Sequence, residues 1–407
     1  MASDSPKKSM KYETLFANCD LVPGNTQTKQ LLDEVLEEIG YKPNLKSRQG
    51  IWSLLISLYE AQETIGDRDY VFVAIPAGDD YWGPDEPVTR QTVRTLRDKL
   101  KDAGYLKTKL RSFYGSHFYY RVRCELLEVN LPMFDRYLVE ASVESRVVAS
   151  SAKTKTADGR SRKSIPKSSK EYKDLARLNK IIGSGNVKFS SRMSVKEVSR
   201  SFSDFKTKRG GRFYGVYSHK PKQSRLQNMS IDGSSICEVD ISACSLTILS
   251  SMKHFPLPEG DPYAGITGSK RDIIKALVVR MFGSGDAFND LLSTDQISEL
   301  RMRGIEVQRQ QKELGNRIRD MYPVLELLEP KKLDSETIAY HESEIVVSAI
   351  LALHEQHGAV GLPMHDGLIV RKSAATKAQK TLEEAFDSYC QQNKWSNTNR
   401  LRSTIEC

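Results

Sequence analysis

The stretch from Ile236 to Met252, ICEVDISACSLTILSSM, constrains the fold more than any other part of the sequence. Its first six residues combine β-branched and apolar residues with two acids, which is typical of a short strand ending at Ile241. From Ser242 onward the apolar residues recur at helical spacing, so we expect a helix to follow the strand at once. Asp240 then lies at the carboxyl end of the strand. A carboxylate in that position can hold a divalent metal ion, or it can simply cap the following helix.

The length and composition set broad limits on the class of protein. A chain of 407 residues has room for two or three domains, each with its own hydrophobic core. No apolar run reaches membrane-spanning length, and the N-terminus lacks the apolar segment of a secretory signal. The six cysteines are scattered and form no C-x-x-C pair, which favours reduced thiols over a disulfide framework or a zinc site. We therefore expect a soluble cytoplasmic protein, and the net charge of +9 favours a polyanionic partner.

Residues 1–142 carry helix and strand patterns in a distinctive order. Apolar residues recur at helical spacing in Thr28–Ile39 and Ser47–Ile65, and Val71–Ile75 has the composition of a short strand. Val88–Leu106 predicts a further helix, with Thr89 as its candidate N-cap. The polar face of this last helix is strongly basic.

Two candidate strands follow the basic helix, Tyr105–Leu110 and Phe118–Cys124, joined by a polar turn. Helices, a basic helix and a β-hairpin in this order resemble a winged helix-turn-helix domain. Such domains place the basic helix in the major groove and the hairpin along the DNA backbone. The resemblance implies duplex DNA binding, and the alternative is a solvated charged face in a protein–protein module. The residues expected to contact DNA are Arg90, Gln91, Arg94 and Arg97 on the helix and, for phosphates, Lys107, Lys109 and Arg111 in the hairpin.

Residues 143–170 differ in composition from the segments on either side. Residues 150–170, SSAKTKTADGRSRKSIPKSSK, are rich in Ser and Lys and contain almost no apolar residues. This composition predicts a flexible basic linker. We expect the linker to separate the N-terminal domain from a second domain formed by residues 171–407.

The second domain contains five short motifs whose order is informative. Gly211-Arg212 precedes an aromatic segment, and Leu226-Gln227-Asn228 stands just before the Asp240 strand. The motifs downstream of Asp240 are KRDIIKALVVRMFGSG at Lys270–Gly285 and GLPMHDGLIV at Gly361–Val370.

Together these motifs resemble the palm and fingers of family A DNA polymerases and of single-subunit phage-type RNA polymerases. The resemblance covers Phe202–Arg371 and implies an α+β fold, with an antiparallel palm sheet and helical fingers. Val239-Asp240 is similar to motif A, and His365-Asp366 is similar to motif C at the tip of a hairpin. Arg271 and Lys275 are similar to the basic pair of motif B. The implied activity is template-directed nucleotidyl transfer, most simply that of a DNA polymerase in DNA replication.

The resemblance also assigns a role to each matched residue. Nucleotidyl transfer uses two divalent ions, Mg²⁺ or Mn²⁺, and two carboxylates from separate strands suffice to hold them when substrate and water complete the coordination. The expected metal ligands are Asp240, Ile241 and Asp366, and the expected catalytic residues are Asp240, Asp366 and Lys275. The dNTP or NTP is expected to contact Arg271, Lys275, Phe282 and Ser245, and the DNA primer-template is expected to contact Arg212, Gln227 and His365.

Departures from the family pattern leave the exact reaction open. Phe282 falls seven residues after Lys275, where the family usually has an aromatic residue at the eighth place. Ser245 stands five residues after Asp240, where DNA polymerases usually carry a glutamate that blocks the ribose 2′-hydroxyl. A small side chain there leaves room for a ribonucleotide, so a primase or an RNA polymerase is an alternative. A non-catalytic DNA-binding replication initiator that keeps the palm as a scaffold is another. No convincing set of exonuclease carboxylates precedes the palm, so we expect no proofreading activity.

Overall fold

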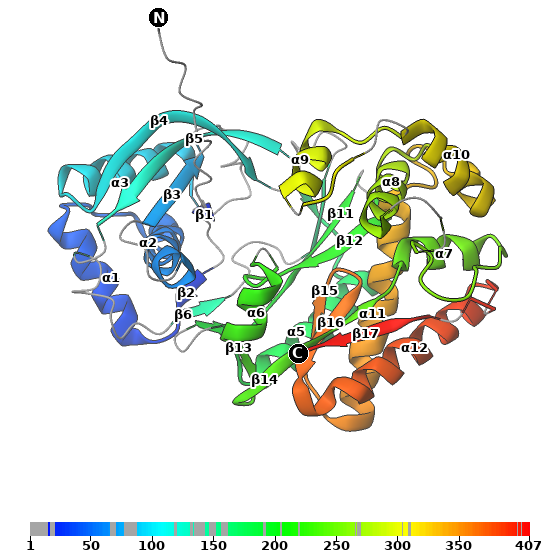
Figure 1. Cartoon of the computed structure of the whole chain (residues 1–407). Helices are drawn as coiled ribbons and strands as arrows, with labels where there is room; N and C mark the ends of the chain where they lie inside the picture. Colours follow the sequence, from blue (N-terminus) through cyan, green and yellow to red (C-terminus); the bar gives the residue numbers. More distant parts are fainter. Residues whose placement is uncertain are drawn as a thin grey trace, which may run out of the picture. The chain divides into compact units, whose positions relative to one another are not determined.

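The computed structural model combines helices with largely antiparallel sheets and divides into two compact units (Figure 1). Unit 1 comprises Met1–Ala149 and Lys188–Lys196, and unit 2 comprises Ser150–Val187 and Glu197–Cys407. The mixed content confirms the predicted α+β class. The structure describes residues 15–16, 21–65, 71–76, 88–117, 120–130, 133, 143–145, 152–155, 162–189, 193–203, 206–218, 220–264, 266, 270–302, 304–307, 311–396, 398–399 and 401–407. Within these residues, none of the helices has both the length and the apolar character needed to cross a membrane.

Unit 1 contains the N-terminal helices and a sheet of strand order β1-β3-β5-β4. A further run of strands pairs in the order β2-β6-β10-β9. The helices are α1 (Thr26–Glu38), α2 (Leu45–Ile65) and α3 (Arg90–Asp102). The strands are β1 (Leu15–Phe16), β2 (Leu21–Pro23), β3 (Val71–Pro76), β4 (Leu106–His117), β5 (Tyr120–Val129), β6 (Val143–Ser145), β9 (Val187–Phe189) and β10 (Met193–Val195).

The helices of unit 1 lie where the sequence pattern predicts them. The Thr89 side chain accepts a hydrogen bond from the backbone N–H of Thr92, so Thr89 is the N-cap of α3 as predicted. The hairpin differs from its prediction, because the expected turn at residues 111–117 forms the outer part of β4. β4 pairs with β5 as far as His117 opposite Tyr120, and register shifts on either side of Leu110 place extra residues of β4 opposite β5.

The segment predicted as a flexible linker contains strands. β6 pairs with β10, while β7 (Ala152–Lys155) pairs with β11 (Ser199–Ser203) and with β8 (Arg162–Ser164). The polar composition of this segment does not prevent pairing, because strand pairing uses backbone N–H and C=O groups that every non-proline residue has. The structure therefore differs here from the predicted linker.

Unit 2 carries the segments that resemble a polymerase palm and fingers. Its helices are α5 (Lys170–Ser184), α6 (Lys222–Asn228), α7 (Cys244–Met252), α8 (Arg271–Ser284), α9 (Thr294–Met302), α10 (Gln311–Met321), α11 (Ser335–His357) and α12 (Ala375–Gln392), with short 3₁₀ helices η1 (Pro323–Leu327) and η2 (Lys372–Ala374). Its strands, besides β7, β8 and β11, are β12 (Lys206–Tyr214), β13 (Met229–Ile231), β14 (Ser234–Ile241), β15 (Gly361–Met364), β16 (Gly367–Arg371) and β17 (Ser403–Glu406).

The sheet that positions the candidate site is built around β14. Its strand order is β15-β16-β14-β13, and the C-terminal strand β17 also pairs with β14. The sequence between Ile236 and Ile241 places apolar side chains at the centre of this sheet, where Ile236 and Val239 are almost completely buried. Helices α11 and α12 pack against each other and against strands of this sheet, so β14 is an interior strand.

A disulfide joins Cys237 on β14 to Cys407, the last residue of the chain. The pairing of β17 with β14 brings these cysteines together although 170 residues separate them. The expectation of reduced thiols is therefore wrong for this pair, and no spacing pattern in the sequence could have indicated it. Cys244 and Cys390 are free and buried.

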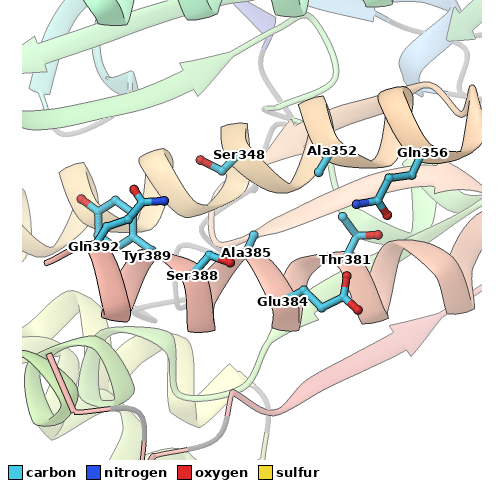
Figure 2. A pocket seen from close by; sticks show the side chains of 9 residues that line it. All are labelled: Ser348, Ala352, Gln356, Thr381, Glu384, Ala385, Ser388, Tyr389 and Gln392. Atoms are coloured by element: carbon cyan, nitrogen blue, oxygen red, sulfur yellow. The ribbon is translucent and has the colours of Figure 1, made fainter. Parts of the chain in front are cut away.

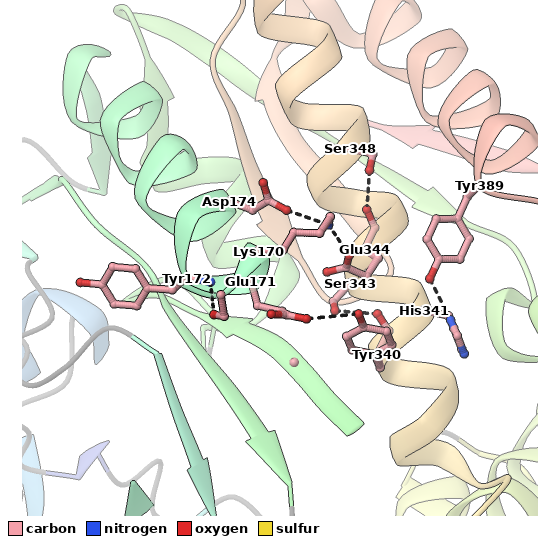
Figure 3. A network of polar contacts seen from close by, with 12 residues as sticks. Lys170, Glu171, Tyr172, Asp174, Tyr340, His341, Ser343, Glu344, Ser348 and Tyr389 are labelled. Carbon is pink, nitrogen blue, oxygen red and sulfur yellow. Dashed lines mark hydrogen bonds and ion pairs between the residues drawn. The ribbon is translucent and has the colours of Figure 1, made fainter. Parts of the chain in front are cut away.

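A network of polar side chains joins α5 to α11 (Figure 3). Lys170 Nζ lies 2.8 Å from Asp174 Oδ2 and 2.5 Å from Glu344 Oε2. On the same face of α11, the Tyr340 hydroxyl donates to Glu171 Oε1. Burial lowers the pKa of Lys170, but its hydrogen bonds to Asp174 and Glu344 outweigh burial and raise that pKa to about 12. The charged lysine therefore fixes the start of α5 on α11.

Candidate active site

Asp240 and Asp366 meet where β14 pairs with the β15–β16 hairpin. Asp240 stands opposite Gly367 in the register, and the backbone N–H of Ile241 donates to the carbonyl of Asp366 at 3.2 Å. A Cβ atom on Gly367 would lie 2.4 Å from the carbonyl oxygen of Val239 and 2.6 Å from Oδ1 of Asp240. Only glycine therefore permits this close approach. The segments similar to motifs A and C are neighbours in the sheet.

Asp240 does not cap the helix that follows it. Helix α7 begins at Cys244, and its N-cap is Ala243, which has a φ of 51° and makes no side-chain cap hydrogen bond. The Asp240 carboxylate instead accepts a hydrogen bond from Lys222 Nζ at 2.9 Å. The side chain of Asp240 remains 30% exposed, so it is accessible from solvent.

Two carboxyl groups in this region, the partly buried Asp366 and the buried Glu342, are hard to ionise. Burial and then the like charge of Asp240 raise the pKa of Asp366 to about 6. Glu342 of α11 is 3% exposed, and burial, opposed by Arg212 and reinforced by Asp366, raises its pKa to about 7. Like charges brought together in a poorly hydrated place disfavour ionisation, and a cation between them would relieve this cost.

Besides Lys222 of α6, cations on β12 and α8 act on these carboxyl groups. Arg212 Nη2 lies 3.7 Å from Glu342 Oε2, and Arg212 lowers the pKa of both Glu342 and Asp366. Lys275, which is exposed on α8, also lowers the pKa of Asp366. Two of the predicted basic residues, Arg212 and Lys275, therefore act electrostatically on Asp366.

The Gly-Gly-Arg segment lies within β12. Gly210 and Gly211 have φ values of 73° and 85°, and the pairing of β12 with β11 is irregular beside them. A Cβ on Gly211 would lie 3.0 Å from both the Phe202 ring and Ser343 Oγ. The glycines thus let β12 pass close to α11 and carry Arg212 toward Glu342.

The predicted site residues on α8 differ in their exposure to solvent. Arg271 is exposed, forms a short ion pair with Asp261 and lies 5.6 Å from the centre of the Tyr263 ring. Lys275 is exposed one turn further along. Phe282 is only 3% exposed, because the end of α8 that carries it is packed in the core. The expectation that the Phe282 ring stacks against a base is therefore at odds with its burial.

The remaining predicted site residues lie on β14, α6, α7 and the β15–β16 hairpin. Ser245 is partly exposed in the first turn of α7, and Ile241 is buried beside Asp240. Gln227 is exposed on α6. His365 occupies the tip of the β15–β16 hairpin with a φ of 51°.

The basic face of α3 in unit 1 is smaller than predicted. Arg90, Gln91 and Arg94 are exposed. Arg97 is only 19% exposed and lies 2.9 Å from Glu125 Oε2 and 2.6 Å from Asp98 Oδ1, so it is used in ion pairs within unit 1. Lys107 is exposed, and the side chains of Lys109 and Arg111 lie outside the described residues.

Several charged residues near Asp240 were not predicted. Glu238, two residues before Asp240, is 2% exposed and accepts two hydrogen bonds from Arg225 at 2.7 and 2.9 Å. Lys222 and Glu342 also belong to this region. No sequence signal singles out Glu342, because it lies in the polar run His341–Glu344 of α11 and only the packing shows that its carboxyl group is buried. No sequence pattern indicates Lys222.

A separate cavity of about 250 Å³ lies between α11 and α12 (Figure 2). None of the predicted site residues lines it. The lining side chains are mostly polar and come from both helices: Ser348, Ala352, Gln356, Thr381, Glu384, Ala385, Ser388, Tyr389 and Gln392.

The raised pKa of Glu342 predicts a pH dependence of stability in protein freed of metal by a chelator. The folded state holds this proton more tightly than the unfolded state, whose value is near 4.5. The stability contributed by protonated Glu342 is thus complete below about pH 4.5 and lost as the pH rises through about 7, by an amount of about 3 kcal/mol. We expect Glu342→Gln to reduce the fall in thermal unfolding midpoint between these pH values. The exposed Glu355→Gln is the control, and an unchanged pH profile in Glu342→Gln would contradict the assignment.

Comparisons with known proteins are sparse. No family model matches the chain, and no curated protein matches it. Among 86 chains of solved structures that do match, one is described as "POL domain of Pol1 from M. smegmatis complex with DNA primer-template and dNTP". It shares 11% sequence identity and has a TM-score of 0.28. The match covers 93% of this chain and 63% of that chain, so the chain spans less than two thirds of its length. With so low a TM-score, function must be argued from the site itself.

Proposed function

We propose that the chain catalyses template-directed nucleotidyl transfer as a DNA polymerase. The observation that carries the proposal is the pairing of Asp240 with Gly367, which brings Asp240 of β14 beside the turn of the β15–β16 hairpin that carries Asp366. Arg212 and Lys275 face the same acidic group, as their effects on the pKa of Asp366 indicate. In nucleotidyl transfer, carboxylates hold the metal ions and nearby cationic side chains stabilise the negative charge on the phosphate oxygens.

The donor set fits hard divalent cations such as Mg²⁺ or Mn²⁺. Within the described part of the chain, no cluster of three or more His, Cys, Asp or Glu side chains is arranged for a metal. Magnesium is usually held by only one or two carboxylates, with water and substrate phosphates supplying the other oxygens. Burial and the charge of Asp240 raise the pKa of Asp366, and a cation bound between the two carboxylates would offset this effect. Asp240, Asp366 and the backbone of Ile241 would hold the ions, which would activate the attacking oxygen and stabilise the leaving oxygen.

The chain's own side chains would bind and orient the substrates. Lys275 and Arg271 lie on the exposed side of α8 and would bind the triphosphate, with Arg271 exchanging Asp261 for phosphate. Arg212, Gln227 and His365 would contact the primer-template. In unit 1, Arg90, Gln91 and Arg94 would bind duplex DNA through a winged-helix domain.

Primer extension on a defined template tests this proposal. Purified protein should extend a labelled DNA primer with dNTPs when Mg²⁺ or Mn²⁺ is present and stop when a chelator is added. An oligonucleotide that stays unextended with either metal, with dNTPs and with NTPs, would refute nucleotidyl transfer.

A primase or RNA polymerase is the second candidate, and Ser245 favours it. Ser245 is partly exposed in the first turn of α7, five residues after Asp240. Its short side chain leaves space where a longer acid would meet a ribose 2′-hydroxyl. Synthesis from NTPs without a primer would favour this candidate over a DNA polymerase.

Ser245→Glu should therefore change the choice of sugar. We expect it to lower NTP incorporation relative to dNTP incorporation by about 100-fold, a discrimination that steric exclusion in a shaped pocket can supply. Competing NTPs and dNTPs in one primer-extension reaction measures the ratio. Ser245→Ala is the matched control and should leave the ratio near that of the wild type. If Ser245→Glu also leaves it unchanged, the side chain does not face the sugar.

A further inference from the structure

A lysine lies directly on the Asp240 carboxylate. Lys222 is the first residue of α6, and its Nζ lies 2.9 Å from Asp240 Oδ2 and 2.8 Å from Glu406 Oε2. One ammonium group is thus shared between an aspartate of the candidate active site and a glutamate of the C-terminal strand. The Lys222 side chain is 33% exposed, so it has room to move.

The position of Glu406 follows from the pairing of β17 with β14. Glu406 stands opposite Glu238, and Thr404 stands opposite Asp240. Directly opposite residues share a face of a sheet, as do residues two apart in one strand. Glu406, Glu238 and Asp240 therefore lie on one face. The disulfide between Cys237 and Cys407 anchors the strand immediately after Glu406.

The packing of this region does not require Lys222. Arg225 already satisfies Glu238 with two hydrogen bonds, whereas Lys222 Nζ is 3.9 Å from the nearer Glu238 oxygen. Lys222 also forms ion pairs with Asp240 and Glu406, but ion pairs with this degree of exposure contribute little to stability. The main consequence of Lys222 is a positive charge at Oδ2 of Asp240.

We propose that Lys222 is a positioning residue that competes with a divalent ion for Asp240 Oδ2, and that Glu406 weakens this competition by drawing the ammonium group toward β17. This inference rests on the proposed function, in which Asp240 holds such an ion. An ammonium group and a metal ion repel each other and cannot both occupy the same oxygen lone pairs. When the ion binds, Lys222 releases Asp240 and remains on Glu406, so the C-terminal strand sets the affinity of the metal site.

Binding of Mn²⁺, followed by electron paramagnetic resonance, tests the proposal without relying on activity. We expect Lys222→Met to increase Mn²⁺ affinity by about tenfold, because the competing charge is removed. Glu406→Gln should decrease the affinity by about threefold, because Lys222 then has Asp240 as its remaining close acceptor. The double variant should bind Mn²⁺ as Lys222→Met does, because Glu406 acts only through Lys222. The exposed Lys377→Met and Glu355→Gln make the same charge changes elsewhere and should match the wild type.

The outcomes separate this inference from the proposed function. An Mn²⁺ affinity that is unchanged or lower in Lys222→Met would overturn the inference. So would a double variant that binds more weakly than Lys222→Met, since Glu406 would then bind the metal itself. If the wild type binds no Mn²⁺, or if Asp240→Asn binds Mn²⁺ as tightly as the wild type does, the proposed function fails and this inference fails with it. If Asp240→Asn removes the Mn²⁺ while Lys222→Met and Glu406→Gln both match the wild type, the inference alone fails. Thermal unfolding of each variant verifies that the fold is retained.

Discussion

Asp240→Asn and Asp366→Asn should each reduce primer extension at least about 1000-fold, which corresponds to about 4 kcal/mol of transition-state stabilisation. The pairing of β14 with β16 brings together Asp240 and the hairpin turn that carries Asp366, although more than a hundred residues separate them in the sequence. An asparagine keeps the size of the side chain but removes the charge that would hold a divalent ion. The rate of primer extension under single-turnover conditions measures the loss.

Folding should survive these substitutions. Removing one like charge from the group formed by Asp240, Asp366 and Glu342 relieves repulsion, so metal-free Asp366→Asn should be at least as stable as the wild type at about pH 8. Asp320→Asn, on an exposed position of α10, is the matched control and should retain full activity. Primer extension at the wild-type rate by Asp240→Asn or Asp366→Asn would exclude that aspartate from the reaction.

Arg200→Met should lower the free energy of unfolding of unit 2 by about 3 to 5 kcal/mol, the usual cost of removing one partner of a buried ion pair. The Arg200 side chain is fully buried and donates to Glu344 Oε1 and Ser343 Oγ, both at 2.7 Å. It also donates to the carbonyl of Gly211 at 2.9 Å. Methionine fills similar space but leaves the buried Glu344 carboxylate with Lys170, whose side chain is largely exposed. Urea denaturation measures the change.

The same substitution should disturb Arg212, because Arg200 ties the backbone of Gly211 to α11. Arg177→Met on the exposed side of α5 is the control and should change stability by less than about 0.5 kcal/mol. Combining Arg200→Met with Glu344→Gln should destabilise less than the sum of the two single variants, because the partners share one interaction. A loss below about 1 kcal/mol in Arg200→Met would show that the ion pair is dispensable.

Local patterns were sufficient for the elements around Asp240. A run of β-branched and apolar residues followed by helical spacing predicted the strand and helix seen as β14 and α7. Thr89 was recognisable as an N-cap because that role depends on a hydrogen bond three residues along the chain. The strands β7 and β8 escaped prediction because their pairing depends on distant β11 rather than on their own composition.

The sequence by itself indicated the strand that contains Asp240, the hairpin that carries Asp366, and the basic pair Arg271 and Lys275 on a helix. The strand follows from short-range periodicity and residue chemistry, whereas the hairpin and the basic pair were expected from the resemblance to polymerase motifs. Only the tertiary structure decided what surrounds Asp240: Gly367 opposite it, Lys222 on its carboxylate, and Glu406 held near it by β17. It also placed Phe282 in the core and joined Cys237 to Cys407. These contacts arise when segments far apart in the chain pair or pack, and no local pattern encodes which distant side chain will lie within reach of a carboxylate.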